Sequence, residues 1–241
     1  MNKLSIVIPA YNEENRISKT LDSVDGFFRN NNFQYEIIVV NDGSKDKTAS
    51  VVQSLLPRIS NLKLINNQDN HGKGYVVRQG MLASMGDVRL FMDADNSTSI
   101  EQVLNMLPYL DQGFDLVIGS IEMVGATVEE NAQSYRRILG YGAKYVIRFF
   151  SGLSDINDTQ RGFKLFTAAA SEKIFSMATI DRFGFDIEVL VLAKKLGYKI
   201  KEVPVAWKNS DESTVSLYSY AETLFELFRI RLNLLTGIYR I

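Results

Sequence analysis

Two aspartates in the sequence Asp93-Ala94-Asp95 are spaced so that both carboxylates could hold one divalent cation. They follow an apolar run that ends at Met92, which predicts a buried strand with the two carboxylates at its tip. Carboxylate oxygens suit Mg²⁺ or Mn²⁺, which typically bind one or two carboxylates together with the oxygens of a substrate diphosphate. The alternative is a solvated or helix-capping turn, because so short a motif also arises by chance.

Another acidic residue, Asp42, follows the apolar run from Tyr35 to Val40 and precedes the pair Gly43-Ser44. At a strand end, such a carboxylate could accept hydrogen bonds from a ribose hydroxyl or a base N–H group. The alternative is an ordinary Asp-Gly turn.

The segment from Pro9 to Glu13 follows the first apolar run in the same way. Pro9 would end a strand, Tyr11 could stack on a base, and Glu13 would begin a helix, with Asn12 between them. The alternative is simple punctuation between a strand and a helix.

A cluster of small and basic residues, His71-Gly72-Lys73-Gly74, precedes a predicted helix. Backbone N–H groups at a helix start, together with the charge of Lys73, could meet a phosphate, although the spacing is not that of a Walker loop. His71 is the only histidine and no G-x-S-x-G elbow accompanies it, which disfavours hydrolase chemistry.

These loops are separated by apolar runs that alternate with segments of helical pattern, which predicts an α/β fold with a mostly parallel sheet. In such sheets ligands bind beyond the carboxyl ends of the strands, where all four loops would lie. Further strands are expected at Leu116 to Ser120 and Lys199 to Val205, with a mobile polar loop from Glu122 to Ser134. We expect one domain over residues 1–210 and an amphipathic helical appendage over residues 211–241.

Bulk composition excludes several classes of protein. A net charge of −1 gives no basic field for nucleic acid. The absence of cysteine excludes disulfides and thiolate metal sites, and together with the lack of a visible secretory leader it predicts a cytoplasmic location. No apolar run is long enough for a membrane span. The apolar side of the amphipathic segment from Leu217 to Ile241 would either lie on a membrane surface or dock on the core.

The ordered motifs together resemble the family 2 glycosyltransferases, in particular the polyprenyl-phosphate group and most closely its dolichyl-phosphate β-glucosyltransferases. The matching segments cover nearly the whole chain: Val7 to Glu13, Val40 to Ser44, Asn70 to Gly74, Met92 to Asp95, Asp158 to Lys164, Phe185 to Glu188 and Ile230 to Gly237.

The resemblance implies a GT-A fold, a UDP-glucose donor, a divalent cation (Mg²⁺ or Mn²⁺) at Asp93 and Asp95, and a lipid-linked phosphate acceptor. It places Asp158 beside the reacting centre and Lys164 near the donor diphosphate or the acceptor phosphate. The predicted donor-binding set is Pro9, Tyr11, Asn12, Glu13, Asp42, Gly72, Lys73, Asp93 and Ala94. The predicted catalytic set is Asp158, Lys164 and Asp95. A single in-line displacement would invert the anomeric configuration.

Two departures from the family pattern fall on the acceptor side. Ile121 and Thr214 stand where relatives carry cations, so the predicted acceptor-binding residues are ones that could replace that charge or lie in the Asp158 motif: Arg136, Arg137, Gln160 and Arg161. These departures leave open an alternative enzyme with a soluble glycan acceptor. A non-catalytic nucleotide-sugar binding module is a further alternative, against which the intact aspartates argue.

Overall fold

Strands and helices alternate along the chain in a computed structural model, which describes residues 3–129, 147, 150–208 and 217–239. The strands are β1 (Leu4–Ala10), β2 (Tyr35–Asp42), β3 (Leu62–Asn67), β4 (Val88–Met92), β5 (Leu116–Ser120), β6 (Thr127–Glu129), β7 (Phe163–Thr167), β8 (Ile200–Pro204) and β9 (Ala206–Lys208). The helices are α1 (Ile17–Asn30), α2 (Thr48–Leu55), α3 (Lys73–Ala83), η1 (Ile100–Gln102, a 3₁₀ turn), α4 (Val103–Asp111), α6 (Ala168–Met177), α7 (Phe185–Lys195) and α8 (Leu217–Leu235).

The central sheet has seven strands in the order β3-β2-β1-β4-β7-β5-β8. Adjacent strands pair in parallel, except that β7 is antiparallel to both β4 and β5. The predicted mostly parallel sheet is therefore confirmed. Strand β7 was not predicted, nor was the small parallel sheet of β6 and β9. Residues 127–129 of the predicted mobile loop thus form a strand, and residues 130–134 lie outside the described residues.

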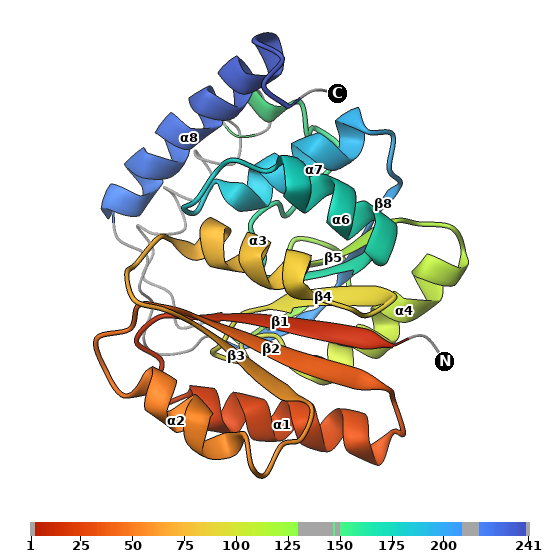
Figure 1. Cartoon of the computed structure of the whole chain (residues 1–241). Coiled ribbons are helices and arrows are strands. Elements are labelled where there is room, and N and C mark those ends of the chain that lie inside the picture. The colour runs from red at the N-terminus through yellow and green to blue at the C-terminus, as the bar shows by residue number, and fades with distance from the viewer. Residues whose placement is uncertain (1–2, 130–146, 148–149, 209–216, 240–241) are drawn as a thin grey trace.

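Helices cover both faces of the sheet (Figure 1). Helices α1 and α2 lie on one face, α3, α6 and α7 lie on the other, and α8 forms an outer layer beyond α7. Strands β1, β2 and β4 run in parallel, so the loops that follow them emerge at the same edge of the sheet. This is the arrangement that the sequence predicted for its candidate ligand loops.

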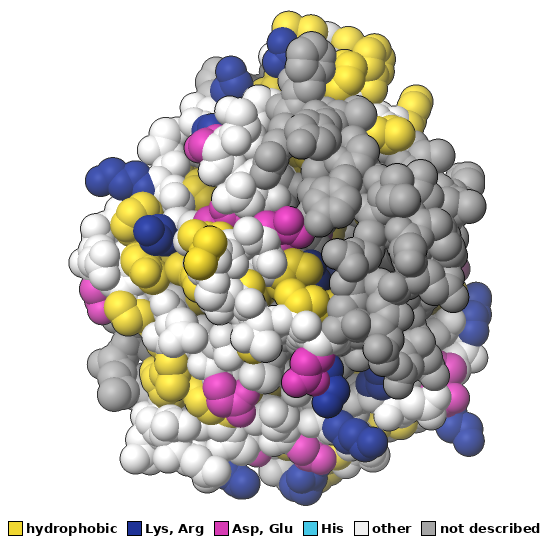
Figure 2. Space-filling model, turned by 180° about the vertical axis from the view of Figure 1, so that it is seen from behind, with side chains coloured by type: hydrophobic (Ala, Val, Ile, Leu, Met, Phe, Trp, Pro, Cys, Tyr) yellow, Lys and Arg dark blue, Asp and Glu magenta, His cyan; other side chains and the backbone are white. Residues whose placement is uncertain are grey.

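Helix α8 docks on the core through one face and exposes a second apolar face. Leu227 and Ile230 are buried in the same hydrophobic cluster as α7. The opposite side, which we call the outer face of α8, carries exposed apolar residues: Leu224, Phe225, Phe228, Leu232, Leu235 and, just beyond the helix, Ile238. Figure 2 shows such side chains gathered where α8 ends at the top of the molecule. Among the described residues, no helix contains an apolar stretch sufficient to cross a bilayer.

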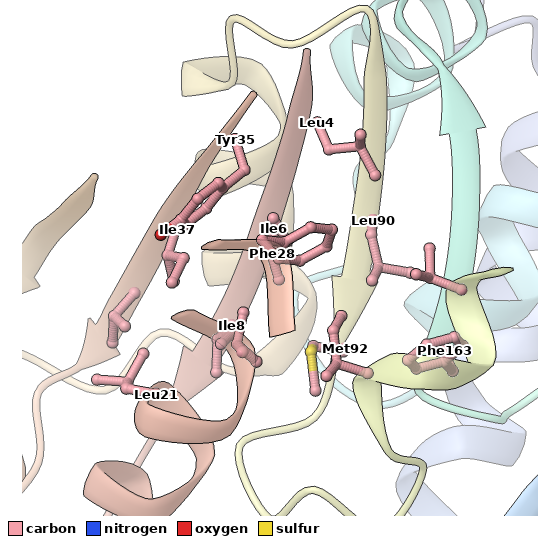
Figure 3. Packing of buried hydrophobic residues seen from close by; sticks show 14 of the residues in the cluster. Leu4, Ile6, Ile8, Leu21, Phe28, Tyr35, Ile37, Leu90, Met92 and Phe163 are labelled. Atoms are coloured by element: carbon pink, nitrogen blue, oxygen red, sulfur yellow. The ribbon is translucent and has the colours of Figure 1, made fainter. Parts of the chain in front are cut away.

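The core between the sheet and α1 holds the strand ends in place. Leu21 and Phe28 of α1 are seven residues apart and therefore share a face, which packs against Ile6, Ile8 and Ile37 of the sheet (Figure 3). All five side chains are fully buried. Burying each contributes about 1.5–3 kcal/mol, which makes this layer a rigid support for the loops at the strand tips.

Candidate active site

The turn after β4 presents two carboxylates at the strand tip, as the sequence predicted. The backbone N–H of Asp93 donates to the carbonyl of Gly162 at 3.1 Å, and the carbonyl of Ala94 accepts from Thr20 Oγ1 at 2.6 Å. Ala94 is buried, whereas Asp93 and Asp95 are half-buried. These two backbone hydrogen bonds, one at Asp93 and one at Ala94, anchor the turn that carries the carboxylates.

The alternative interpretation of this motif was a local turn, and a local turn is also present. Oδ1 of Asp95 accepts from the backbone N–H of Ser97 at 2.9 Å, which closes a local turn. Asn96 between them has a φ of 55°, a left-handed conformation that asparagine tolerates well. The turn therefore shapes the loop and presents carboxylate oxygens at the same time.

Lys73, the first residue of α3, lies directly against this turn. Its Nζ is 2.7 Å from Oδ1 of Asp93. Burial alone would lower the pKa of Lys73, but the negative charges of Asp93, Asp186 and Asp95 outweigh burial and raise that pKa above its ordinary value. The ammonium group is thus held charged beside the two aspartates.

A second cation lies behind the first. Lys164 of β7 is fully buried, and its Nζ contacts Oδ1 of Asp186 and donates to the carbonyl of Arg161 at 2.7 Å. Burial raises the pKa of Asp186 despite the neighbouring lysines. The ring of Phe91 lies beside both cations, with its centroid 5.5 Å from Nζ of Lys73 and 6.0 Å from Nζ of Lys164. Asp186 belongs to a matched motif but had no predicted role.

The loop after β1 brings a third carboxylate near the aspartates. Glu13 forms a two-point ion pair with Arg16, at 2.7 and 2.9 Å. Burial raises the pKa of Glu13, and the charges of Asp95 and Asp93 add to that rise against the opposing effect of Arg16. Glu13 is therefore within electrostatic range of Asp93 and Asp95.

The other predicted residues of this loop differ in exposure. Pro9 is buried at the end of β1, and Tyr11 is 39% exposed with a ring free to meet a ligand. Asn12 ties this loop to the next one, because its N–H donates to Ser44 Oγ at 3.0 Å and its Oδ1 accepts from the N–H of Lys45 at 2.8 Å.

Asp42 is buried, and both of its carboxylate oxygens are already engaged. Oδ1 accepts from the N–H of His71 at 2.7 Å, and Oδ2 accepts from the N–H of Gly72 at 2.9 Å and from Asn70 Nδ2 at 2.8 Å. Burial raises the pKa of Asp42 in spite of these bonds. In this structure Asp42 binds the following loop, and its predicted contact with a nucleoside stays a prediction.

The predicted acceptor side is centred on Asp158. This buried carboxylate accepts from the N–H of Ile121 at 3.2 Å and pairs with Nε of Arg161 at 3.3 Å. The guanidinium of Arg161 also lies 4.9 Å from the ring of Trp207. Glu202, which the sequence did not single out, accepts from the N–H of Asp158 at 2.8 Å. The carboxylate of Asp158 is thus held by one backbone N–H and one guanidinium.

Several residues predicted to bind the acceptor do not join the contacts around Asp158. Gln160 is exposed next to this group, and within the described part of the chain no hydrogen bond joins its side chain to Asp158. Arg136, Arg137 and Thr214 lie outside the described residues.

The two carboxylates at the tip of β4 fit a divalent cation that also binds a substrate. Within the described ranges, no group of three or more His, Asp or Glu side chains could hold a metal ion by itself. Two half-buried carboxylates match Mg²⁺ or Mn²⁺, which take their remaining ligands from a diphosphate and water. With only two carboxylates, such a cation would take its other ligands from outside the chain.

Comparisons with known proteins match the chain to a family of glycosyltransferases. A sequence model of the family described as Glycosyl transferase family 2 matches residues 5–175. The chain is 36% identical to a dolichyl-phosphate β-glucosyltransferase of Dictyostelium discoideum, over 99% of this chain and 76% of that protein. Its identity to the human protein of the same name is 33%, over 99% of this chain and 78% of the human protein.

Solved structures of other enzymes share the fold. A glucosyl-3-phosphoglycerate synthase of Mycobacterium tuberculosis, solved with Mn²⁺, UDP-glucose and phosphoglyceric acid, superposes with a TM-score of 0.71 at 18% identity, over 96% of this chain and 79% of that one. Mannosyl-3-phosphoglycerate synthase of Rubrobacter xylanophilus gives 0.68 at 18% identity, over 100% of this chain and 76% of that one. At such identities the likeness shows the fold alone, which is the GT-A fold.

Proposed function

The chain belongs to glycosyl transferase family 2, and on this premise we propose that it transfers glucose from UDP-glucose to a polyprenyl or dolichyl phosphate. The observation that carries the proposal is the pair of aspartates at the β4 tip, with the charged groups of Lys73 and Lys164 behind them. Relatives that match nearly the whole chain bear the name of this activity, which supports both the donor and the acceptor.

On the donor side, Asp93 and Asp95 would hold Mg²⁺ or Mn²⁺ together with the diphosphate. A bound cation supplies positive charge that stabilises the leaving diphosphate as its negative charge grows. Lys73 and Lys164 add fixed positive charge from the chain itself, and being preorganised they need not reorient during the reaction. Tyr11 offers an exposed ring for stacking on the base.

On the acceptor side, the attacking group would be a phosphate oxygen. The second pKa of a phosphate monoester is about 6, so this oxygen is ionised at neutral pH and needs no strong general base. Asp158, which is held by Ile121 and Arg161, would orient the acceptor more than deprotonate it. Attack opposite the leaving diphosphate would convert the α-linked donor into a β-linked product.

Transfer to a long-chain lipid phosphate requires contact with a membrane, and the outer face of α8 is suited to that contact. Its exposed apolar side chains, Phe225 and Phe228 among them, alternate with the exposed cations Arg229 and Arg231. Apolar residues flanked by cations favour an anionic lipid surface. We place the protein on the cytoplasmic face of that membrane, in keeping with a chain without cysteine.

A soluble acceptor is the second candidate, and one observation favours it. Ile121, which stands where relatives carry a cation, packs against the hydrophobic core beside Asp158. A charge expected to meet the acceptor phosphate is therefore replaced by an apolar side chain at this position.

An acceptor assay separates the two candidates. Radiolabelled UDP-glucose and Mn²⁺ would be offered to vesicles that contain polyprenyl phosphate and, in parallel, to soluble glycans. We expect label in the lipid fraction, and we expect EDTA to abolish transfer and added Mn²⁺ to restore it. Label only in the soluble fraction would support the second candidate, and transfer that EDTA leaves unchanged would contradict the metal site.

Vesicle sedimentation tests the outer face of α8. Replacing Phe225 and Phe228 with serine should weaken binding to anionic vesicles by about tenfold or more, because two large apolar side chains no longer enter the lipid. Met85→Ser is the matched control, since Met85 is 73% exposed but lies far along the chain from α8. Equal loss in both variants would count against a role specific to α8.

A further inference from the structure

The connection between α6 and α7, residues 178–184, contacts two regions that have separate predicted roles. On one side it meets α8, and on the other it meets the loop of residues 69–72, which we call the donor loop. The backbone N–H of Tyr75 in α3 also donates to the carbonyl of Asp181 at 3.1 Å. The connection is therefore the place where the outer helix and the donor loop could influence each other.

Helix α8 fixes the backbone of this connection. The buried carboxylate of Glu226 accepts from the N–H of Gly184 at 2.7 Å and from the N–H of Arg182 at 3.3 Å. Glu222, one turn earlier, lies 4.0 Å from Nε of Arg182. Burial raises the pKa of Glu226, and its two backbone partners oppose that rise. The position of Arg182 is thus set by α8.

The side chain of Arg182 reaches the donor loop. Its NH1 donates to Oδ1 of Asn70 at 2.9 Å. Because a guanidinium is only a donor, this bond turns the amide so that Nδ2 of Asn70 faces away from Arg182 and donates to Asp42 at 2.8 Å. Asp42 in turn holds the N–H groups of His71 and Gly72. One hydrogen-bonded chain therefore runs from α8 to the start of α3.

Backbone packing tightens the same link. Gly72 has a φ of 107°, and a Cβ added there would lie 2.4 Å from the carbonyl oxygen of Asp181. A Cβ on Gly74 would lie 2.5 Å from the carbonyl oxygen of Ile180. The two segments therefore touch backbone to backbone, and a small shift of the connection would move the donor loop.

We propose that Arg182 is a positioning residue, through which α8 sets the geometry of the donor loop. The inference rests on the proposed function, in which this loop and Lys73 meet the donor diphosphate. Arg182 acts through Asn70 of the donor loop, so its effect falls on donor binding rather than on the transfer step. A planar guanidinium suits this task, because separate N–H groups face Asn70 and Glu222 in a fixed geometry.

The test compares donor affinity with stability. Calorimetry with UDP-glucose and Mn²⁺ should show Arg182→Gln raising the Kd about tenfold, the loss expected for a charged hydrogen bond. Arg182→Lys keeps the positive charge but lacks the planar guanidinium. Its Kd for UDP-glucose should lie between the values of Arg182→Gln and the wild type. The KM for UDP-glucose should rise in parallel, while the KM for the acceptor and the kcat stay within about twofold of the wild type.

Arg78→Gln is the matched control. Arg78 pairs with Asp181 of the same connection at 2.7 Å but has no part in the hydrogen bond to Asn70, so its loss should lower the Tm and raise the Kd for UDP-glucose much less than Arg182→Gln does. In a double-mutant cycle, Arg182→Gln should have little further effect once Asn70 is replaced by serine.

Three outcomes would overturn the inference. Arg182→Gln with a lowered Tm but unchanged Kd and KM would show a purely structural role, and additive effects of the two substitutions would exclude the route through Asn70. A wild-type chain that binds no UDP-glucose would overturn the proposed function and this inference with it. Either of the first two outcomes, with wild-type binding of UDP-glucose intact, overturns the inference alone.

Discussion

The two ends of the central sheet use the same kinds of side chain in opposite ways. At the amino ends of β1, β2 and β3, Glu36 accepts from Ser5 at 2.6 Å, from Lys63 at 2.7 Å and from the N–H of Met85 at 2.8 Å, and its side chain is 4% exposed. At the carboxyl end of β4, the side chain of Asp93 is 35% exposed beside Lys73.

On the proposed function, this difference in exposure separates carboxylates that stabilise the fold from carboxylates that bind a ligand. A carboxylate with a full set of donors stabilises the fold and offers little to a ligand, because its lone pairs are occupied. A carboxylate that is paired yet open to solvent can exchange its partner for a cation or a substrate. If this contrast is right, substitutions at the two ends should affect different measured quantities.

The largest expected effect is on catalysis at the carboxyl end. Asp95→Asn keeps the shape of the side chain but removes its negative charge, so the divalent cation and the diphosphate would no longer be held correctly. We expect kcat for transfer to fall about 10²–10³-fold, a loss comparable to that of one electrostatic contact in other active sites. The Tm should change little, and a large loss of stability would break the contrast between the two ends.

The second effect probes the space around Asp93. A Cβ added at Gly162 would lie 2.0 Å from Oδ2 of Asp93, so Gly162→Ala must displace that carboxylate. Since small displacements of positioned groups can cost about 10²-fold in rate, we expect a loss of that order in a steady-state transfer assay.

Gly26→Ala is the control for this substitution. Gly26 lies within α1, and a Cβ there would meet nothing within 4 Å. Alanine favours a helix over glycine by about 1 kcal/mol, so this variant should raise the Tm by about 2–4 °C at unchanged kcat. If both alanine variants lost activity to the same degree, a general effect of glycine replacement would be the better explanation.

The smallest effect on catalysis is expected at the amino end, where the change should appear in stability. Burial alone would raise the pKa of Glu36, but hydrogen bonds from Lys63, Ser5 and Met85 outweigh it and hold that pKa at about 2, below the ordinary 4.5. Folding therefore favours the charged form. Its stabilisation, about 3 kcal/mol, is complete above about pH 4.5 and is lost as the pH falls toward 2.

Urea unfolding of Glu36→Gln at about pH 6 and about pH 3 checks this. The variant should be less stable than the wild type by a few kcal/mol at the higher pH, with a smaller difference at the lower pH, while kcat per folded molecule is unchanged. A difference that grew on acidification would contradict the pKa direction.

The sequence predicted the parallel half of this architecture well, because each strand and each ligand loop there is a local pattern. The apolar run that ends at Met92 predicts both β4 and the position of the two aspartates that follow it at the strand tip. Tyr11 and Lys73 are similarly fixed by their places at a strand end and a helix start.

What the sequence missed depends on contacts between distant segments. Strand β7 is only five residues long, and its antiparallel insertion requires partners more than 40 residues away. Asp186 can be identified as a site residue only through its contact with Lys164, which lies on that strand. The hydrogen bonds of Asp42 to the backbone of residues 71 and 72 could not be predicted either, because an Asp-Gly pair does not show which distant groups its carboxylate meets.

The place of β7 also has a consequence for how the chain folds during synthesis. Strand β5 pairs only with β7 and β8 in the described sheet, and both are made later. Until the ribosome has passed Thr167, β4 lacks its second neighbour and β5 lacks both. Open strand edges of this kind invite pairing with other chains, so a nascent chain stalled before β7 would be the form most prone to aggregation.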